Sequence, residues 1–135
     1  KEKFIIGGSK VIRKSNSDLA TIIAAGITLY EALEAYEELK KEGIFIRIID
    51  LYSIKPLDAV TLKEASRETN AIITVEDHFL EGGIGETVRS ALANIDIPVH
   101  SLAVRKIPKS GKPEELLDYE EISKIAIMKK IKELV

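Results

Sequence analysis

Apolar side chains along the chain fall into short continuous runs separated by stretches of helical spacing. Four runs have no regular polar face, which is typical of strands buried on both sides of a sheet: Leu19–Ala25, Ile44–Leu51, Ile72–Val75 and Ile97–Val104. A fifth run, Lys10–Lys14, alternates apolar and basic residues. It is predicted to form a short strand at the edge of the sheet.

The stretch after the first buried run predicts a helix. Thr28 and Glu31 have the spacing of a capping box, in which a hydroxyl and a carboxylate each accept from a free N–H group of the first turn. Gly43 supplies a left-handed stop. Apolar residues between these points recur every three or four positions and are expected to face the core: Leu29, Leu33, Tyr36 and Leu39.

Three further helices are predicted between or after the remaining runs. Asp58 is the expected N-cap of a helix that reaches about Glu68. Another helix runs from Gly83 to about Asn94, a single turn covers Pro113–Leu117, and a last helix begins near Ser123. The residues expected on the inner faces are Val60, Leu62, Ala65, Ile84, Val88, Ala91, Leu92, Ile127, Met128, Ile131 and Leu134.

The order of elements is therefore one strand followed by four strand–helix units. Buried strands that alternate with crossover helices require a mostly parallel sheet covered on both faces. The pattern contains no internal repeat and no linker-like segment. We therefore expect one α/β domain over residues 1–135.

The stretch Ile72–Gly85 is the most informative part of the pattern. Glu76, Asp77 and His78 follow directly on a buried run, and Gly82 and Gly83 then lead into a helix. In open α/β sheets, ligands and partner surfaces collect at the carboxyl ends of the strands. This end of the sheet is where a functional site is expected.

Composition and charge narrow the possible functions. A chain of 135 residues forms one domain of ordinary size, and a net charge of −2 gives no reason to expect nucleic acid or an anionic membrane as a partner. The chain has no cysteine, and two histidines cannot form a His-rich metal site. No apolar run approaches the roughly 20 residues that span a bilayer.

The start of the chain, Lys1–Lys3, has neither an initiator methionine nor a signal pattern. It is expected to be the interior of a longer chain cut at a domain boundary, although removal of the methionine would look the same. The chain is expected to be cytoplasmic.

Each motif has two interpretations. The Glu76–His78 cluster could serve general acid/base chemistry, but no nucleophile stands at a suggestive spacing, and a structural or interface role is favoured. Gly82-Gly83-x-Gly85 could hold a phosphate at a helix N-terminus, but it lacks the G-x-G-x-x-G register, and a tight turn is favoured. Lys109–Lys112 could bind an anion or form a solvated loop. His100 is interpreted as a core or interface histidine.

Several of these segments also resemble one family in sequence order. Val75–Glu86 closely resembles the signature of the C-terminal domain of transketolases, particularly their vertebrate-like branch. Ala24–Ala32 is similar to the first strand-to-helix turn of that family. Ile54–Asp58 and Leu102–Val104, with Pro108–Leu117 after it, also match. The sequence departs from the pattern at Asp118–Glu121, where the family usually has an aromatic residue and a glycine.

The resemblance implies a three-layer α/β/α fold. Its five-stranded sheet has the order 1-3-2-4-5, with strand 1 antiparallel. The winding direction then reverses between the ends of Leu19–Ala25 and Ile72–Val75, so Gly26–Thr28 and Glu76–His78 should line a crevice. The residues expected at this crevice or interface are Gly26, Thr28, Glu76, Asp77, His78, Gly82 and Gly83.

The resemblance also implies a function. Transketolases transfer a two-carbon ketol unit between sugar phosphates, using thiamine diphosphate and a divalent metal, Mg or Ca, held between the amino-terminal and middle domains of two subunits. This chain has no counterpart of the metal-binding motif or of the activating glutamate. It is therefore expected to be an assembly domain that is inert alone, with no catalytic, cofactor-binding or metal-binding residue. Its partners would be the middle and N-terminal domains of the same homodimeric enzyme, and neither nucleic acid nor a membrane is expected.

Two alternatives remain open. The chain could belong to a related thiamine-dependent enzyme, either a 2-oxo acid dehydrogenase β chain or a deoxyxylulose-phosphate synthase. It could also be a regulatory module that binds an anion or a nucleotide in the crevice.

Overall fold

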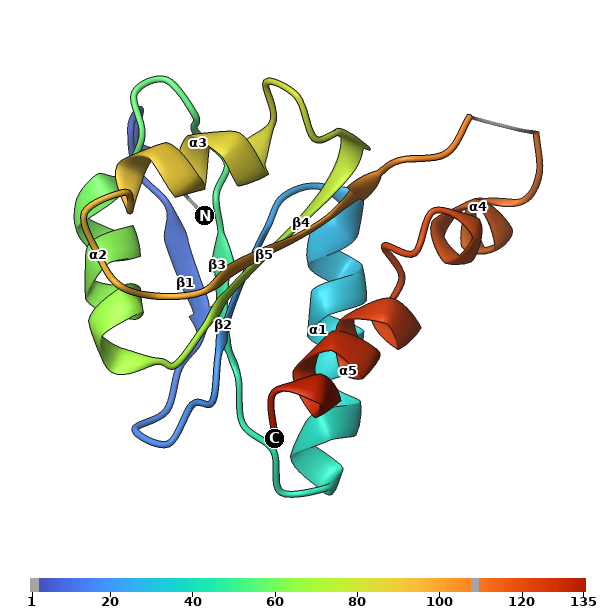
Figure 1. Ribbon diagram of the computed structural model, residues 1–135, viewed down its shortest axis with the longest axis horizontal. Helices are drawn as coiled ribbons and strands as arrows, with labels where there is room; N and C mark the ends of the chain where they lie inside the picture. Colours follow the sequence, from blue (N-terminus) through green and yellow to red (C-terminus); the bar gives the residue numbers. More distant parts are fainter. Residues whose placement is uncertain (1–2, 108–109) are drawn as a thin grey trace.

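A five-stranded sheet forms the centre of the computed structural model, which describes residues 3–107 and 110–135 (Figure 1). The strand order is β1-β3-β2-β4-β5, and β1 pairs antiparallel with β3 while the other pairs are parallel. This topology confirms the order 1-3-2-4-5 and the antiparallel first strand. The strands are β1 (Lys10–Arg13), β2 (Thr21–Ala24), β3 (Arg47–Asp50), β4 (Ile72–Phe79) and β5 (Val99–Val104).

Helices cover both faces of this sheet. α1 and α5 lie on one face, α2 and α3 on the other, and α4 stands apart from the layers beyond the ends of β4 and β5 (Figure 1). The helices are α1 (Ile27–Lys41), α2 (Ala59–Glu68), α3 (Ile84–Ala91), α4 (Pro113–Tyr119) and α5 (Lys124–Glu133). In the part of the chain described here, no helix has the length and apolar character needed to cross a membrane.

Each face of the sheet has its own apolar core. Ile22 packs with the α1 and α5 side, and its neighbour Ile23 packs with the α2 and α3 side. Successive side chains of a strand point to opposite faces, and both faces are covered by helices, so both residues are fully buried. Burying an isoleucine stabilises the fold by roughly 1.5–3 kcal/mol, which explains why these strands have no polar face.

The strands differ in length from the apolar runs. Leu19–Ala25 and Ile44–Leu51 contain ladders of only Thr21–Ala24 and Arg47–Asp50, although the flanking Leu19 and Leu51 N–H groups still donate to the carbonyl oxygens of Phe45 at 2.8 Å and Ala24 at 2.9 Å. By contrast, β4 is longer than the apolar run that predicts it. It continues past Val75 to Phe79, which pairs with Val104 across an irregular register. The acidic–histidine cluster is thus part of the strand and does not follow it.

Three details of the helices test the predictions further. The capping box at the start of α1 is wrong: Gly26 is the N-cap and has no capping side chain, while Thr28 and Glu31 bond elsewhere. Asp58 is confirmed as the N-cap of α2, accepting from the Thr61 N–H at 3.1 Å. Val60 does not face the core and is 76% exposed, because α2 turns that position towards solvent.

Candidate functional site

Glu76 lies in β4 and holds the start of α3. Its side chain is 1% exposed, and its two oxygens accept from the backbone N–H groups of Ile84 at 2.8 Å and Gly85 at 2.7 Å. These N–H groups belong to the first turn of a helix and have no partner within it. A carboxylate placed there also interacts favourably with the helix dipole. Glu76 is therefore a buried anchor for the start of α3.

His78 extends this arrangement to the surface. Its Nδ1 atom lies 3.1 Å from Glu76 Oε1 and 3.0 Å from the Phe79 carbonyl oxygen. Both neighbours are acceptors, so Nδ1 carries a proton and Nε2 points away from them. The side chain is 50% exposed. The buried carboxylate therefore fixes the orientation of an imidazole whose other side can meet a partner.

The glycines after β4 allow this close packing. A Cβ atom on Gly83 would overlap Glu76 Oε1 and the His78 ring, although its φ of −98° suits any residue. Gly82 has a φ of 75° and open space around it. Gly85 would place a Cβ 2.6 Å from Ser101 Oγ. The turn interpretation holds, with close approach required at Gly83 and a left-handed conformation at Gly82.

Thr28 closes the base of the expected crevice. Its hydroxyl is fully buried and donates to the carbonyl oxygens of Ala25 and Val75, each at 2.9 Å. This bond ties the end of β2 to β4. Gly26 precedes it with a φ of 61°. Thr28 therefore shapes the switch point between the strands from a buried position, while Gly26 is exposed beside it.

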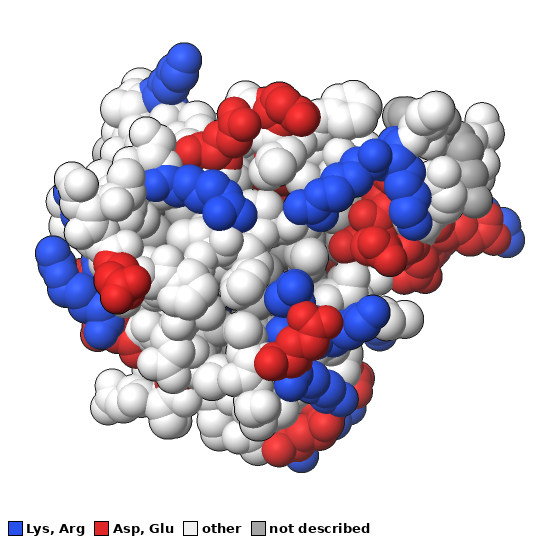
Figure 2. All heavy atoms as spheres, in the orientation of Figure 1, with Lys and Arg blue, Asp and Glu red and all other residues white. Residues whose placement is uncertain are grey.

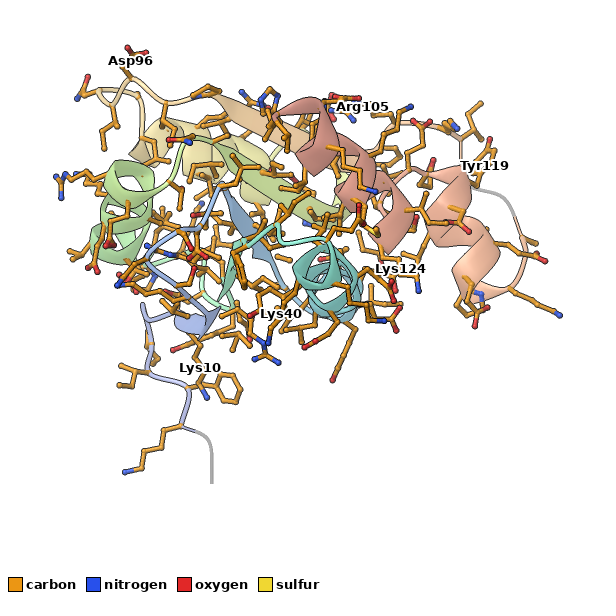
Figure 3. The ribbon with its side chains drawn as sticks, turned by 90° about the horizontal axis from the view of Figure 1, so that it is seen from below. Lys10, Lys40, Asp96, Arg105, Tyr119 and Lys124 are labelled. Atoms are coloured by element: carbon orange, nitrogen blue, oxygen red, sulfur yellow. The ribbon has the colours of Figure 1, made fainter. Side chains whose placement is uncertain are left out.

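An apolar groove of about 430 Å³ opens beside the switch point, between the ends of β4 and β5 and helix α4. Of the residues expected to line a crevice, it includes Asp77 and His78 but not Thr28 or Glu76. Phe79 is 53% exposed at its wall. Tyr119 contributes from α4, which Figure 3 shows standing away from the sheet. Its apolar lining, including the exposed Phe79 ring, suits a contact with an apolar surface.

The described residues do not fit a metal and diphosphate site. No group of three or more His, Cys, Asp or Glu side chains able to hold a metal ion occurs within residues 3–107 and 110–135. The buried carboxylate of Glu76 is already occupied by two backbone N–H groups. The absence of cofactor-binding and metal-binding residues in this domain remains a prediction.

Sequence reasoning missed two parts of this site. The role of Glu76 could have been found from strand alternation, because Glu76 is in register with the buried Ile72 and Thr74. The wall formed by α4 could have been suspected from the apolar residues after Pro113, namely Leu116 and Leu117. His100 lies half-buried in β5, as expected. Pro108 and Lys109 lie outside the described residues, so the anion loop 109–112 is not tested.

The fold is an α/β domain in which the Glu76 carboxylate at the end of β4 holds the start of α3. Residues 8–127 match the family model described as transketolase, C-terminal domain, and the chain belongs to this family. It is 55% identical to transketolase-like protein 2 of Mus musculus and 48% identical to the transketolase of Homo sapiens. Each alignment covers 99% of this chain and 22% of the relative. The chain thus spans about a fifth of the length of these curated relatives.

Solved structures agree with this assignment. The chain is similar to a split gene transketolase described as an inactive beta4 tetramer, with a TM-score of 0.89 and 33% identity over 98% of this chain and 44% of that one. Campylobacter jejuni transketolase has the same fold, with a TM-score of 0.70 at 18% identity over 94% of this chain and 18% of that one. These relatives are transketolases or transketolase-like proteins and do not favour the alternatives of another thiamine enzyme or a regulatory module.

Proposed function

We propose that the chain is a single domain over residues 1–135 that packs and assembles a transketolase. The complete enzyme would transfer a two-carbon ketol unit between sugar phosphates, with thiamine diphosphate and Mg or Ca held by its other domains. The domain alone would be inactive. Its partners would be the middle and N-terminal domains of a cytoplasmic homodimer, on the same chain or on a separate one.

One observation carries this proposal: a rigidly oriented, half-exposed His78 stands at an apolar groove whose wall includes the exposed Phe79. Contact surfaces with high affinity combine apolar anchors with polar groups that are already in place. Glu76, the ionisable neighbour of His78, already accepts from two backbone N–H groups at the start of α3. The arrangement therefore supports docking better than proton transfer.

The docking role can be tested with two variants and one control in the complete enzyme. His78→Ala should weaken the association of domains or subunits about tenfold, since a polar group left unpaired at an interface costs roughly 1–3 kcal/mol. Phe79→Ala should weaken it by a similar factor, since it removes an apolar anchor. Val60→Ala removes an exposed apolar side chain from α2 and serves as the control. Sedimentation over a range of concentrations measures the association.

Stability of the isolated domain provides the second measurement. His78→Ala should barely change its melting temperature, because the ring is half-exposed and Glu76 keeps its two backbone N–H donors without it. A large loss in the isolated domain together with unchanged association in the complete enzyme would contradict the docking role. Ketol transfer by this chain alone, supplied with cofactor, magnesium and both sugars, would contradict the proposal of an inactive domain.

A further inference from the structure

The free edge of the sheet carries a second groove that the docking role does not use. β5 is the last strand in the order, and a groove of about 700 Å³ runs along it between α3 on one face and α5 on the other. Figure 2 shows Lys and Arg side chains around this hollow, over α3, the end of β5 and α5. Its basic and hydroxyl residues are Arg89, His100, Ser101, Arg105, Ser123, Lys129 and Lys130.

Two arginines from different elements converge on one residue of the strand. Arg89, from α3, donates to Ser101 Oγ at 3.0 Å. Arg105, just after β5, donates to the Ser101 carbonyl oxygen at 2.7 Å and lies beside α5 in Figure 3. The two guanidinium groups are therefore neighbours at the groove floor. Each has further N–H donors, because a guanidinium has five.

The groups around Ser101 supply two more donors. Ser101 Oγ accepts from both Thr74 and Arg89, and no acceptor for its own proton is found in the described part of the chain. An edge strand also presents unpaired backbone groups. The N–H and C=O of one strand residue point to the same side, so the Ser101 N–H faces the free edge with the carbonyl that Arg105 contacts. Ser101 is thus a buried residue with donors directed at the groove.

The positive charge of the groove is only partly neutralised. Among the described residues, neither Arg89 nor Arg105 forms an ion pair with a carboxylate. Three acidic residues also line the groove: Glu133 pairs with Lys130 at 3.0 Å, while Asp118 and Glu121 pair with neither arginine.

The surroundings of His100 show the electrostatic character of this groove. Its pKa lies below the usual value, first because burial disfavours the charged ring and then because Lys130 and Arg89 repel the proton, with Glu133 acting in the opposite sense. The net effect of the neighbouring charges is that of a cationic site.

We propose that Arg89, Arg105 and Ser101 form a binding site for a phosphoryl group, either inorganic phosphate or the phosphate of a small monoester. Arginine forks match the geometry of phosphate oxygens, and hydroxyl and backbone N–H donors complete such sites. Arg105 lies across the strand edge and opposes the addition of a strand from another protein. The site does not depend on the docking role proposed above.

Nuclear magnetic resonance can test the site through the histidines. The chain has only His78 and His100, so the imidazole signals of the labelled protein are assigned easily. Inorganic phosphate is titrated at constant pH and constant ionic strength, balanced with chloride. We expect a saturable shift of the His100 signals, with a rise in the pKa of His100 as the anion offsets the nearby cations. His78 does not line this groove, so its imidazole signals should not shift.

Charge-neutralising variants distinguish a site from general screening. Arg89→Met and Arg105→Met should each raise the dissociation constant for phosphate about tenfold, the size expected for a lost charge-assisted hydrogen bond. Arg67→Met removes the same charge from α2, on the other side of the molecule, and should leave binding unchanged. Both groove arginines are exposed, so their variants should melt like the parent.

The outcomes decide the proposal. If glycerol phosphate binds with the same affinity as inorganic phosphate, the site accepts phosphate monoesters. If only inorganic phosphate binds, the site is specific for the free ion. A linear shift without saturation, equal losses in Arg67→Met, or phosphate binding retained by both groove variants would overturn the proposal. Tighter binding of acetate than of either phosphate would overturn the phosphoryl class.

Discussion

The loops that follow β4 and β5 leave the sheet side by side but are built in opposite ways. After β4, the buried carboxylate of Glu76 holds two N–H groups of α3, and Gly83 and Gly85 pack against it without room for a side chain. After β5, the chain reaches α4, whose single buried residue is Leu117. The first loop is fixed by buried hydrogen bonds, whereas the segment after β5 is held by the buried Leu117 and by exposed hydrogen bonds from Lys106 to Tyr119 and Glu120.

This difference separates residues that stabilise the fold from residues that are available for contact. The junction after β4 keeps β4, α3 and the His78 ring in one arrangement, so its residues should be costly to change. The segment after β5 forms an outer wall of the apolar groove, where side chains can change at little cost to the fold. If this comparison is right, equal substitutions should have unequal effects on the two sides.

The largest effect is expected from Glu76→Ala. It leaves the buried N–H groups of Ile84 and Gly85 without an acceptor, and each unsatisfied buried donor costs about 1–3 kcal/mol. We expect the free energy of unfolding to fall by about 3 kcal/mol, measured by chemical denaturation.

Two controls sharpen this prediction. Glu76→Gln keeps the shape and one acceptor oxygen and should lose less than Glu76→Ala. Asp77→Ala changes the exposed neighbour and should stay within about 0.5 kcal/mol of the parent. Equal effects of Glu76→Ala and Asp77→Ala would show that the carboxylate does not hold α3.

A smaller loss is expected from Gly83→Ala. The new Cβ would overlap Glu76 Oε1 and the His78 ring, so the anchor must move, and we expect a loss of about 2 kcal/mol in unfolding free energy. Gly82→Ala is the matched control: it has open space but a φ of 75°, and should lose only about 1 kcal/mol. A greater loss at Gly82 would mean that backbone conformation, and not close approach, governs this turn.

The same contrast explains what the sequence could predict. The mostly parallel sheet was accessible because runs such as Ile72–Val75 are apolar on both faces, whereas the strand order came only from the family resemblance. Strand alternation indicates that Glu76 is buried, but local spacing does not reveal that it accepts from N–H groups of α3. The role of Thr28 was not accessible, because it depends on the Val75 carbonyl of another strand. Val60 fails for a related reason: helical spacing gives a face, but its borders are set by packing.

In the segment after β5, the sequence already revealed a departure from the family pattern. Asp118–Glu121 differs from the usual family pattern, which has a glycine there. In the structure, α4 ends in a Schellman turn: Ile122 N–H donates to the Leu117 carbonyl at 3.0 Å and Glu121 N–H to that of Asp118 at 3.1 Å. Glu121 therefore adopts a φ of 60°, which glycine prefers.

The smallest predicted effect, a gain, follows from Glu121→Gly. α1 ends in the same turn with Gly43 at the equivalent place, at a φ of 78°. A side chain in the left-handed region costs about 1–2 kcal/mol, and glycine loses about 0.5–1 kcal/mol of that through its freer unfolded chain. Glu121→Gly should therefore raise the free energy of unfolding by about 0.5 kcal/mol, while Gly43→Ala should lower it by about 1 kcal/mol. Denaturation midpoints of both variants measure this. A loss on Glu121→Gly would show that the exposed Glu121 side chain stabilises the turn by more than its backbone strain costs.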